Sequence, residues 1–298
     1  MHALVTGSAG FVGQHLLPRL GNAGFEVIGT DLELDVTNEA AVAAKVAELR
    51  PAVIVHLAAL SSVAASWREP ELAYRVNYLG TRSVLEATAR EAPGARVLLI
   101  GSAEEYGSAE PGSAPFTEAS PLRPGSPYAR AKTAADLLGA RYAQGGLDVV
   151  RVRPFNHAGP GQPDIFVLAS FARQVAEIES KRREPVLRVG NLNSVRDFLD
   201  IEDVIDAYVR LLDPSVAAGV YNVASGNGAP LGDHLEALLA LAQLRPAIEV
   251  DPERLRPADF AVGDAGRLRE ATGWAPRVPL SRTLEQVLDY WRKRVGAS

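Results

Sequence analysis

Short aliphatic runs alternate with longer helix-like stretches through the first half of the chain. The runs that predict strands occupy residues 3–5, 25–30, 53–55, 97–100 and 149–152. The helix-like stretches cover residues 14–20, 38–49, 72–90 and 127–142. Continuous β-branched and aliphatic strands that alternate with helices are typical of a parallel sheet covered on both faces. The predicted fold class is therefore α/β, with a doubly wound parallel sheet.

The pattern loosens after Pro154, which predicts a change in organisation. We expect a first domain over residues 1–155 and a smaller C-terminal lobe over residues 156–298, from which a segment at about 198–222 returns to the first domain. Residues 107–128 are rich in Pro, Gly and Ser and predict a long loop of the kind that is usually functional. Ser126 and Pro127 then supply an N-cap and a first helical residue.

Composition narrows the functional classes. The 298 residues are 47% hydrophobic and 22% charged, as in ordinary globular proteins. A net charge of -5 argues against a nucleic-acid partner, so an anionic substrate needs local cations. The absence of cysteine excludes disulfides and thiolate metal sites, and the five histidines lack a zinc-binding spacing, so no metal is predicted. With no apolar run of about 20 residues and no signal-peptide pattern, we expect no membrane contact and a cytoplasmic protein.

A glycine-rich motif follows the first predicted strand. Gly7, Gly10 and Gly13 have the spacing of a dinucleotide-binding turn, in which a tight turn and free helix amides receive a pyrophosphate. Asp31 ends the second predicted strand, where a carboxylate accepts hydrogen bonds from the adenosine ribose. Residues 21–44 contain no Lys or Arg to hold a 2′-phosphate, so NAD(H) is favoured and NADP(H) remains possible. The alternatives are a ligand-free βα turn and, for Asp31, a capping or surface-turn residue.

Three residues predict a site for proton transfer at a carbonyl. Tyr128 and Lys132 are four residues apart in one predicted helix and so share a face. An ammonium beside a phenol is expected to lower the pKa of the phenol. Ser102 follows a predicted strand and so falls at the carboxyl edge of the sheet, where ligands bind in this architecture. The alternative is a surface tyrosine with a solvated lysine.

These motifs resemble those of the extended short-chain dehydrogenases/reductases that modify nucleotide sugars. The resemblance covers essentially the whole chain and rests on the glycine motif, His56-Leu57-Ala58-Ala59, Asn77, Ser102 and Tyr128-x-x-x-Lys132, in family order. Within that family the chain is most similar to the GDP-6-deoxy-D-mannose reductases, through Ser61-Ser62-Val63, residues 101–107, residues 153–162, Val195-Arg196-Asp197-Phe198 and Arg256-Pro257-Ala258-Asp259.

The resemblance implies a Rossmann domain, a substrate-binding lobe and a set of site residues. The catalytic residues it implies are Ser102, Tyr128, Lys132 and Glu104. The cofactor-binding residues are Gly7, Gly10, Phe11, Val12, Gly13, Asp31, Asp35, Val36, Leu57, Ala58, Ala59, Asn77, Tyr128 and Lys132. The substrate-binding residues are Ser62, Glu104, Asn156, Val167, Arg173, Arg196, Arg256 and Asp259.

Within the substrate set, Asn156 and Arg196 are expected to hold the GDP diphosphate, with Arg256 as a second cation and Asp259 on the ribose. The alternatives are an ion pair of Arg196 with Asp197 or Asp200, a solvated loop charge at Arg256 and a turn at Asn156. Two positions depart from the family pattern. Related reductases do not consistently carry an acid like Asp31, and related GDP-mannose enzymes usually have Glu where this chain has Asp259.

By the same resemblance the chain reduces the C4 keto group of GDP-4-keto-6-deoxy-D-mannose to GDP-D-rhamnose. Glu104 keeps open a GDP-mannose 4,6-dehydratase or a 4-epimerase, because dehydratases carry a base at this position. A non-catalytic dinucleotide-sensing protein on the same fold is a further alternative. A homodimer is expected through the helix at 72–90 and the helix of Tyr128. The candidate interface residues are Ala73, Val76, Leu79, Val84 and Leu85, for which burial against the protein's own sheet is the alternative.

Overall fold

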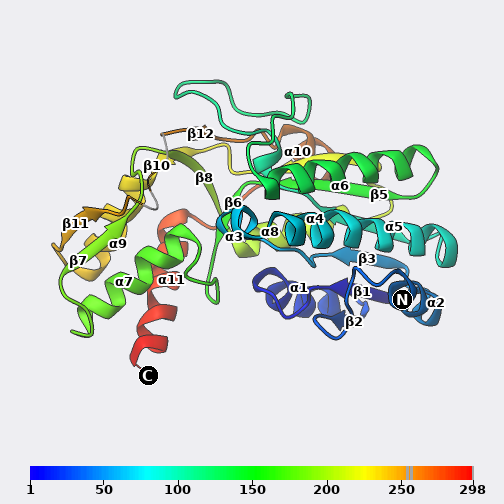
Figure 1. The fold of residues 1–298 in the computed structure, drawn as a ribbon, viewed down its shortest axis with the longest axis horizontal. Helices are drawn as coiled ribbons and strands as arrows, with labels where there is room; N and C mark the ends of the chain where they lie inside the picture. The colour runs from blue at the N-terminus through cyan, green and yellow to red at the C-terminus, as the bar shows by residue number, and fades with distance from the viewer. Residues whose placement is uncertain (253–254, 256–257, 297–298) are drawn as a thin grey trace.

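A computed structural model describes residues 1–252, 255 and 258–296, and its centre is a six-stranded parallel sheet (Figure 1). The strand order is β2-β1-β3-β4-β5-β9. Their bounds are β1 His2–Thr6, β2 Glu26–Thr30, β3 Val53–His56, β4 Arg96–Ile100, β5 Val149–Pro154 and β9 Gly219–Val223. The order reverses beside β1, so the carboxyl ends of β1 and β3 border the crevice in which doubly wound sheets bind ligands.

Helices cover both faces of this sheet, because alternate strand residues are apolar toward each side. Ala3 and Val5 pack with α1 and α8, whereas Leu4 and Ile54 pack with α2 and α5. The helices around the sheet are α1 Phe11–Asn22, α2 Glu39–Leu49, α5 Gly80–Glu91, α6 Pro127–Gln144, α8 Ile201–Leu211 and α10 Gly266–Thr272. The predicted α/β class with a doubly wound sheet is confirmed.

A smaller lobe lies beside the sheet, on the left in Figure 1. Its helices α7 Val167–Glu179, α9 Leu231–Ala242 and α11 Leu280–Gly296 enclose a separate core that includes Phe171, Leu238 and Leu288. Its strands are β6 Asn156–Ala158, β7 Val186–Val189, β8 Val195–Asp200, β10 Gly228–Pro230, β11 Ala247–Val250 and β12 Phe260–Ala261. β8 pairs with β6, β10 and β12, and β7 pairs with β11. The chain then reaches the large sheet again through β9, which pairs with β5.

The stretch at 72–90 differs from the single helix that the sequence predicts. It consists of the end of α4 (Pro70–Tyr74), a π-helical turn at Arg75–Leu79 and α5. A short helix α3, Val63–Arg68, precedes it, and a 3₁₀ turn η2, Ala103–Glu105, follows β4. The loop after η2 is fastened to the smaller lobe through isolated bridges of Ala109 to Phe260 and Phe116 to Gly263.

The structure corrects part of the dimer interface that the sequence analysis placed on these helices. Ala73, Val84 and Leu85 are buried inside their own chain, and Val84 and Leu85 belong to the core between α5 and the sheet. Burial against the protein's own sheet therefore accounts for Val84 and Leu85, whereas Val76 and Leu79 are only partly buried, and the dimer itself stays a prediction. None of the helices among the described residues combines the length and apolarity that crossing a bilayer requires.

Candidate active site

The glycine turn between β1 and α1 is shaped as a cradle for an anion. Gly7 has a φ of 69°, and a Cβ there would lie 2.6 Å from the backbone nitrogen of Ala58. A Cβ at Gly13 would overlap the backbone of Ser8. Helix α1 begins after Gly10 with no side chain capping it, so the N–H groups of its first turn face outward without a side-chain acceptor. These features fit a dinucleotide pyrophosphate.

Asp31 lies at the carboxyl end of β2 and contacts the glycine turn. Its Oδ2 accepts a hydrogen bond from the Ala9 N–H at 2.9 Å, and its Oδ1 accepts one from the Leu32 N–H at 3.0 Å. Each carboxylate oxygen keeps a second lone pair, so the carboxylate supports the turn and can still accept from a ribose. Nearby, Asp35 accepts from the backbone and hydroxyl of Thr37, which lowers the pKa of Asp35.

The loop after β3 is held by buried polar groups. Asn77 is buried in the π-helical turn and exchanges two hydrogen bonds with the backbone of Leu60, at 2.8 and 3.1 Å. His56 lies between the hydroxyls of Thr6 and Thr81, and burial lowers the pKa of His56 to about 3, so its ring is neutral. Of the residues assigned from the sequence, Leu57 and Ala58 lie against the glycine turn at Gly7, and Val36 is buried and packs against α5 at Gly80.

As predicted, Ser102, which follows β4, is brought together with Tyr128 and Lys132 of α6. All three are buried. The Ser102 side chain lies close enough to the Tyr128 hydroxyl to favour its ionised form. Lys132 lies one turn after Tyr128 and donates from Nζ to the backbone oxygen of Ile100 at 2.7 Å. Ser126 caps α6 as expected, and the Tyr128 N–H is satisfied by Ser66 Oγ of α3 at 3.1 Å.

The electrostatics of this group correct one expectation. Burial raises the pKa of Tyr128 above its ordinary value, with Glu104 and Glu105 adding to the rise, while the nearby Ser102 side chain opposes it. Lys132 does not lower this pKa as predicted, because burial dominates and the ammonium is engaged with Ile100. Burial also lowers the pKa of Lys132 to about 8. The phenol is thus held in its protonated, donor form.

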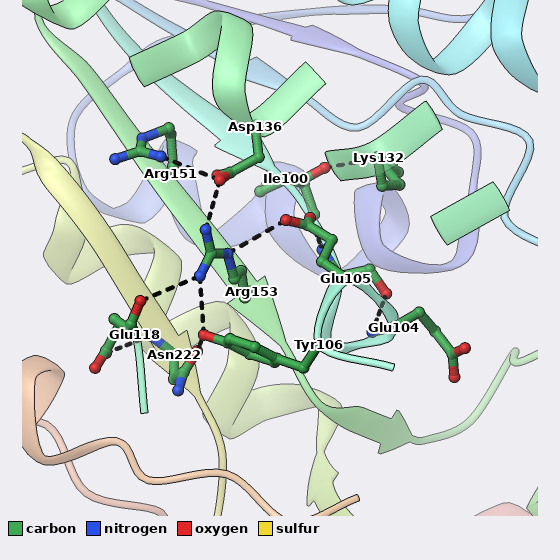
Figure 2. Close-up of polar contacts among 11 residues, drawn as sticks. Ile100, Glu104, Glu105, Tyr106, Glu118, Lys132, Asp136, Arg151, Arg153 and Asn222 are labelled. Carbon is green, nitrogen blue, oxygen red and sulfur yellow. Dashed lines mark hydrogen bonds and ion pairs between the residues drawn. The ribbon is translucent and has the colours of Figure 1, made fainter. Parts of the chain in front are cut away.

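Behind these residues lies a buried ionic cluster that the sequence did not reveal (Figure 2). Arg153 is at its centre, 3.2 Å from Glu105 through Nε and 2.6 Å from Asp136 through Nη2. Arg153 also donates to the Tyr106 hydroxyl at 3.1 Å, and that hydroxyl donates to Asn222 at 2.7 Å. The only signal in the sequence was the pair of adjacent acids Glu104 and Glu105, of which Glu105 is buried and Glu104 is exposed.

On the substrate side, Arg196 and Asp259 form an ion pair at 2.8 Å. The alternative pairings of Arg196 do not occur. Asp197 accepts from Ser225 and from the backbone N–H groups of Gly226 and Gly263. Asp200 accepts from the Glu202 backbone N–H and the Thr283 hydroxyl. Glu104 is exposed to solvent, but enough of the surrounding chain lies near its carboxyl group to desolvate it in part. This partial desolvation raises the pKa of Glu104, and the charge of Arg196 opposes the rise.

The remaining substrate candidates lie on the smaller lobe or at its border. Asn156 is exposed on β6, and Val167 begins α7. Arg173 of α7 is paired with Asp164 and with Glu177, so its charge is already balanced. Ser62 caps α3 by accepting from the Ala65 N–H at 3.1 Å. Arg256 lies outside the described residues.

Comparisons with known proteins agree with this geometry. A GDP-6-deoxy-D-mannose reductase from Pseudomonas aeruginosa is 36% identical over 98% of this chain and 97% of its own. The solved structure of RMD from Pseudomonas aeruginosa in complex with NADPH matches with a TM-score of 0.90 at 34% identity, over 99% of this chain and 100% of that one. A UDP-glucose 4-epimerase from Thermus thermophilus in complex with NAD matches with a TM-score of 0.88 at 29% identity, over 98% and 99% of the two chains.

The family resemblance is therefore confirmed across the sheet and its crevice. The profile of one protein family covers residues 3–224, from β1 to the residue after β9. The chain belongs to the NAD dependent epimerase/dehydratase family.

Proposed function

We propose that this protein reduces the C4 keto group of GDP-4-keto-6-deoxy-D-mannose to give GDP-D-rhamnose, with a reduced nicotinamide dinucleotide as cofactor. The observation that carries the proposal is the 36% identity to a GDP-6-deoxy-D-mannose reductase along nearly the whole of both chains. The convergence of Ser102, Tyr128 and Lys132 at the carboxyl edge of the sheet supports it, since these groups suit proton transfer to a carbonyl oxygen.

The cofactor would lie across the crevice beside β1. A reduced nicotinamide, when bound, supplies the hydride. The first-turn amides of Phe11 and Val12 would receive the pyrophosphate, Asp31 would accept from the adenosine ribose, and Lys132 would bind the nicotinamide ribose. The other residues proposed to line this site are Gly7, Gly10, Gly13, Asp35, Val36, Leu57, Ala58, Ala59 and Asn77.

The chain's own residues complete the reduction. Tyr128 donates its phenolic proton to the C4 oxygen as negative charge develops there. Ser102 donates a hydrogen bond to the same oxygen, which stabilises that charge. Because the pKa of Tyr128 is raised, the phenol carries its proton throughout the neutral range.

The nucleotide end of the substrate is assigned to the border of the smaller lobe. Arg196 offers a guanidinium whose geometry matches diphosphate oxygens, and an acidic protein requires such a local cation. Asn156 and Arg256 would add contacts to the diphosphate, and Asp259 one to the ribose. Ser62, Glu104, Val167 and Arg173 are the remaining proposed contacts.

One observation favours a second candidate, a 4,6-dehydratase or 4-epimerase. The pKa of Glu104 is raised by its enclosure, which suits an acid or base that exchanges a proton with a sugar carbon. Such an enzyme returns the hydride to the sugar and so retains its cofactor. Purified protein that carries stoichiometric NAD⁺ and converts GDP-mannose without added reductant would establish that candidate instead.

The deciding experiment is incubation with GDP-4-keto-6-deoxy-D-mannose and each reduced cofactor, with the sugar product identified by NMR. Formation of GDP-D-rhamnose coupled to loss of absorbance at 340 nm is expected, and Tyr128→Phe is the matched control. Binding of the dinucleotide with no turnover of this substrate or of GDP-mannose would favour a dinucleotide-sensing protein.

The assembly that we propose is a homodimer, and the location that we propose is the cytoplasm. Trp67, Tyr74 and Leu137 are large apolar side chains that are 59%, 49% and 56% exposed on α3, α4 and α6, three helices that contact one another. A dimer interface that covers these three side chains has better support than one built on the residues named from the sequence. Light scattering at micromolar concentration tests it, with Leu137→Glu expected to give monomers. The lack of cysteine fits a reducing compartment, and fractionation of the producing cells tests the location.

A further inference from the structure

Glu105 is a fully buried carboxylate directly behind the proposed catalytic residues. Its Oε1 accepts a hydrogen bond from the backbone N–H of Ser102 at 2.8 Å, and its Oε2 lies 3.2 Å from Arg153 Nε. The chain leaves room for it, because a Cβ at Gly101 would overlap Glu105 Oε1. Figure 2 shows Glu105 turned into the protein toward Arg153, while the adjacent Glu104 points away from the cluster. The backbone here is thus built around an inward-facing acid.

Buried charges require partners, and the groups around Glu105 nearly balance. The groups that face it are Arg153 and, beyond it, Arg151 of β5; Asp136, Lys132 and Tyr128 of α6; and Tyr106, which follows η2. When Glu105 is ionised, it and Asp136 oppose the two guanidiniums of Arg151 and Arg153. Lys132 is then an additional cation, and its Nζ bonds the Ile100 oxygen, two residues before the Ser102 N–H that Glu105 accepts. From this position the charge of Glu105 favours the protonated form of Lys132.

We propose that Glu105 is a positioning residue of this site, which fixes Ser102 through its backbone N–H and stabilises the charge of Lys132 from the protein interior. The role in turnover rests on the proposed reduction. The role toward Lys132 is a property of the protein alone. The motifs shared with the family assign functions to Ser102, Glu104, Tyr128 and Lys132 and give none to this position.

The direction of the effect on Lys132 follows from the charges. Burial, with Asp136 adding to it, raises the pKa of Glu105 to about 8, near the value of about 8 for Lys132. As the pH rises through this range, Glu105 ionises, and its negative charge opposes loss of the proton from Lys132. Without that charge, Lys132 loses its proton at lower pH.

Two substitutions separate the two contributions. Glu105→Gln keeps an oxygen that can accept from the Ser102 N–H but removes the charge, so we expect the pKa of Lys132 to fall by about 0.5–1.5 units. Glu105→Asp keeps the charge but shortens the side chain by one methylene. For this variant we expect kcat to fall about tenfold with KM nearly unchanged, because Ser102 loses its support.

Lys132 can be observed without any substrate. The sequence has four lysines, so ¹³C labelling of lysine gives a short spectrum in which Lys132→Met identifies the Lys132 signal. Titration of the wild type and of Glu105→Gln then measures the pKa directly. Asp148→Asn is the matched control, since Asp148 pairs with the buried Arg96 at 2.8 Å at the opposite end of β4. It is expected to lower stability while leaving the Lys132 titration unchanged.

The same shift should appear in turnover, because the alkaline decline of kcat/KM should begin at a lower pH in Glu105→Gln than in the wild type. An unchanged Lys132 pKa in folded Glu105→Gln, or an equal shift in Asp148→Asn, would overturn the charge role. If Glu105→Gln does not fold, an unchanged kcat in Glu105→Asp overturns the positioning role. Failure of the wild type to reduce the keto sugar overturns the proposed function, and the lysine titration still decides the effect of Glu105 on Lys132.

Discussion

Arg196 Nη2 lies 2.8 Å from Oδ1 and 2.9 Å from Oδ2 of Asp259, so the two residues expected to hold opposite parts of one nucleotide contact each other. Ser108 donates a further hydrogen bond to Asp259 at 3.0 Å. The pair keeps the guanidinium oriented at the border of the smaller lobe in the free protein. A diphosphate that binds there must share Arg196 with this carboxylate.

Replacing Arg196 by Lys should therefore weaken substrate binding more than catalysis. Lysine keeps the charge but loses the planar donors, so we expect KM for the GDP sugar to rise about tenfold and kcat to change less than about threefold. Steady-state kinetics at saturating cofactor measure both. Arg188→Lys, at an exposed pair on β7, is the control. An unchanged KM would remove Arg196 from the nucleotide site.

Tyr128→Phe should abolish most turnover and spare cofactor binding. The ring still packs beside Ser102, but the proton donor is gone, and general acid catalysis is typically worth about 10²–10⁴-fold. Single-turnover oxidation of NADH measures the loss, and fluorescence titration measures cofactor affinity. Wild-type turnover in this variant would show that another group protonates the sugar oxygen.

The pH profile of the wild type should have one alkaline limb. Burial lowers the pKa of Lys132 to about 8, so its ammonium is present below that pH and is lost as the pH rises through it. The raised pKa of Tyr128 keeps the phenol protonated over the same range. We expect kcat/KM to be level below about pH 7 and to fall above about pH 8. Lys132→Met should lower activity at every pH and remove the limb, whereas a profile that rises above pH 8 would contradict this assignment.

Asp31 should give a preference for NADH of at least about tenfold in kcat/KM, equivalent to about 1.4 kcal/mol. Its carboxylate would face the 2′-phosphate of NADPH, and residues 21–44 contain no Lys or Arg to compensate. Asp31→Ser should shrink the preference mainly by improving the use of NADPH. Asp213→Ser, at a carboxylate that accepts from Ser215 in a distant turn, is the control. Equal use of both cofactors by the wild type would mean that Asp31 only supports the glycine turn.

Ser66→Ala tests how α3 supports Tyr128. Ser66 is fully buried and its Oγ accepts from the Tyr128 N–H, so the substitution leaves a buried donor unpaired, at a cost of about 1–3 kcal/mol. Ser83→Ala is the matched control, because Ser83 Oγ only bonds back to the Leu79 carbonyl within its own helical turn. Urea unfolding compares the two free energies of unfolding. Equal losses in the free energy of unfolding would show that the hydrogen bond to Tyr128 adds no stability beyond that of a serine bonded within its own helix.

Local signals in the sequence were sufficient for the parts of the site that depend on neighbouring residues. The Ser126-Pro127 pair marks where α6 begins, and the four-residue spacing of Tyr128 and Lys132 puts them on one face, because both depend on helix geometry alone. The glycine turn is equally local, since the close approach at Gly7 requires a residue without a Cβ.

Long-range partners were beyond such reasoning. Arg196 and Asp259 are 63 residues apart, and no periodic pattern indicates that they meet. Glu105 has the sequence context of a solvated acid at a helix start, and only Arg153, 48 residues later, makes its burial possible. The stretch expected as a helix at 72–90 is helical throughout, but the sequence did not indicate the π-helical turn within it. The π-helical turn there carries Asn77, whose two hydrogen bonds are to Leu60, outside the helix.

The return of the chain to the large sheet through β9 has a consequence during synthesis. β5 ends at Pro154, but its neighbour β9 is complete only when Val223 has been made. A nascent chain that has left the ribosome only as far as the smaller lobe therefore displays the open side of β5, with its unpaired N–H and C=O groups. Slow translation between these two strands would prolong that exposure until β9 completes the large sheet.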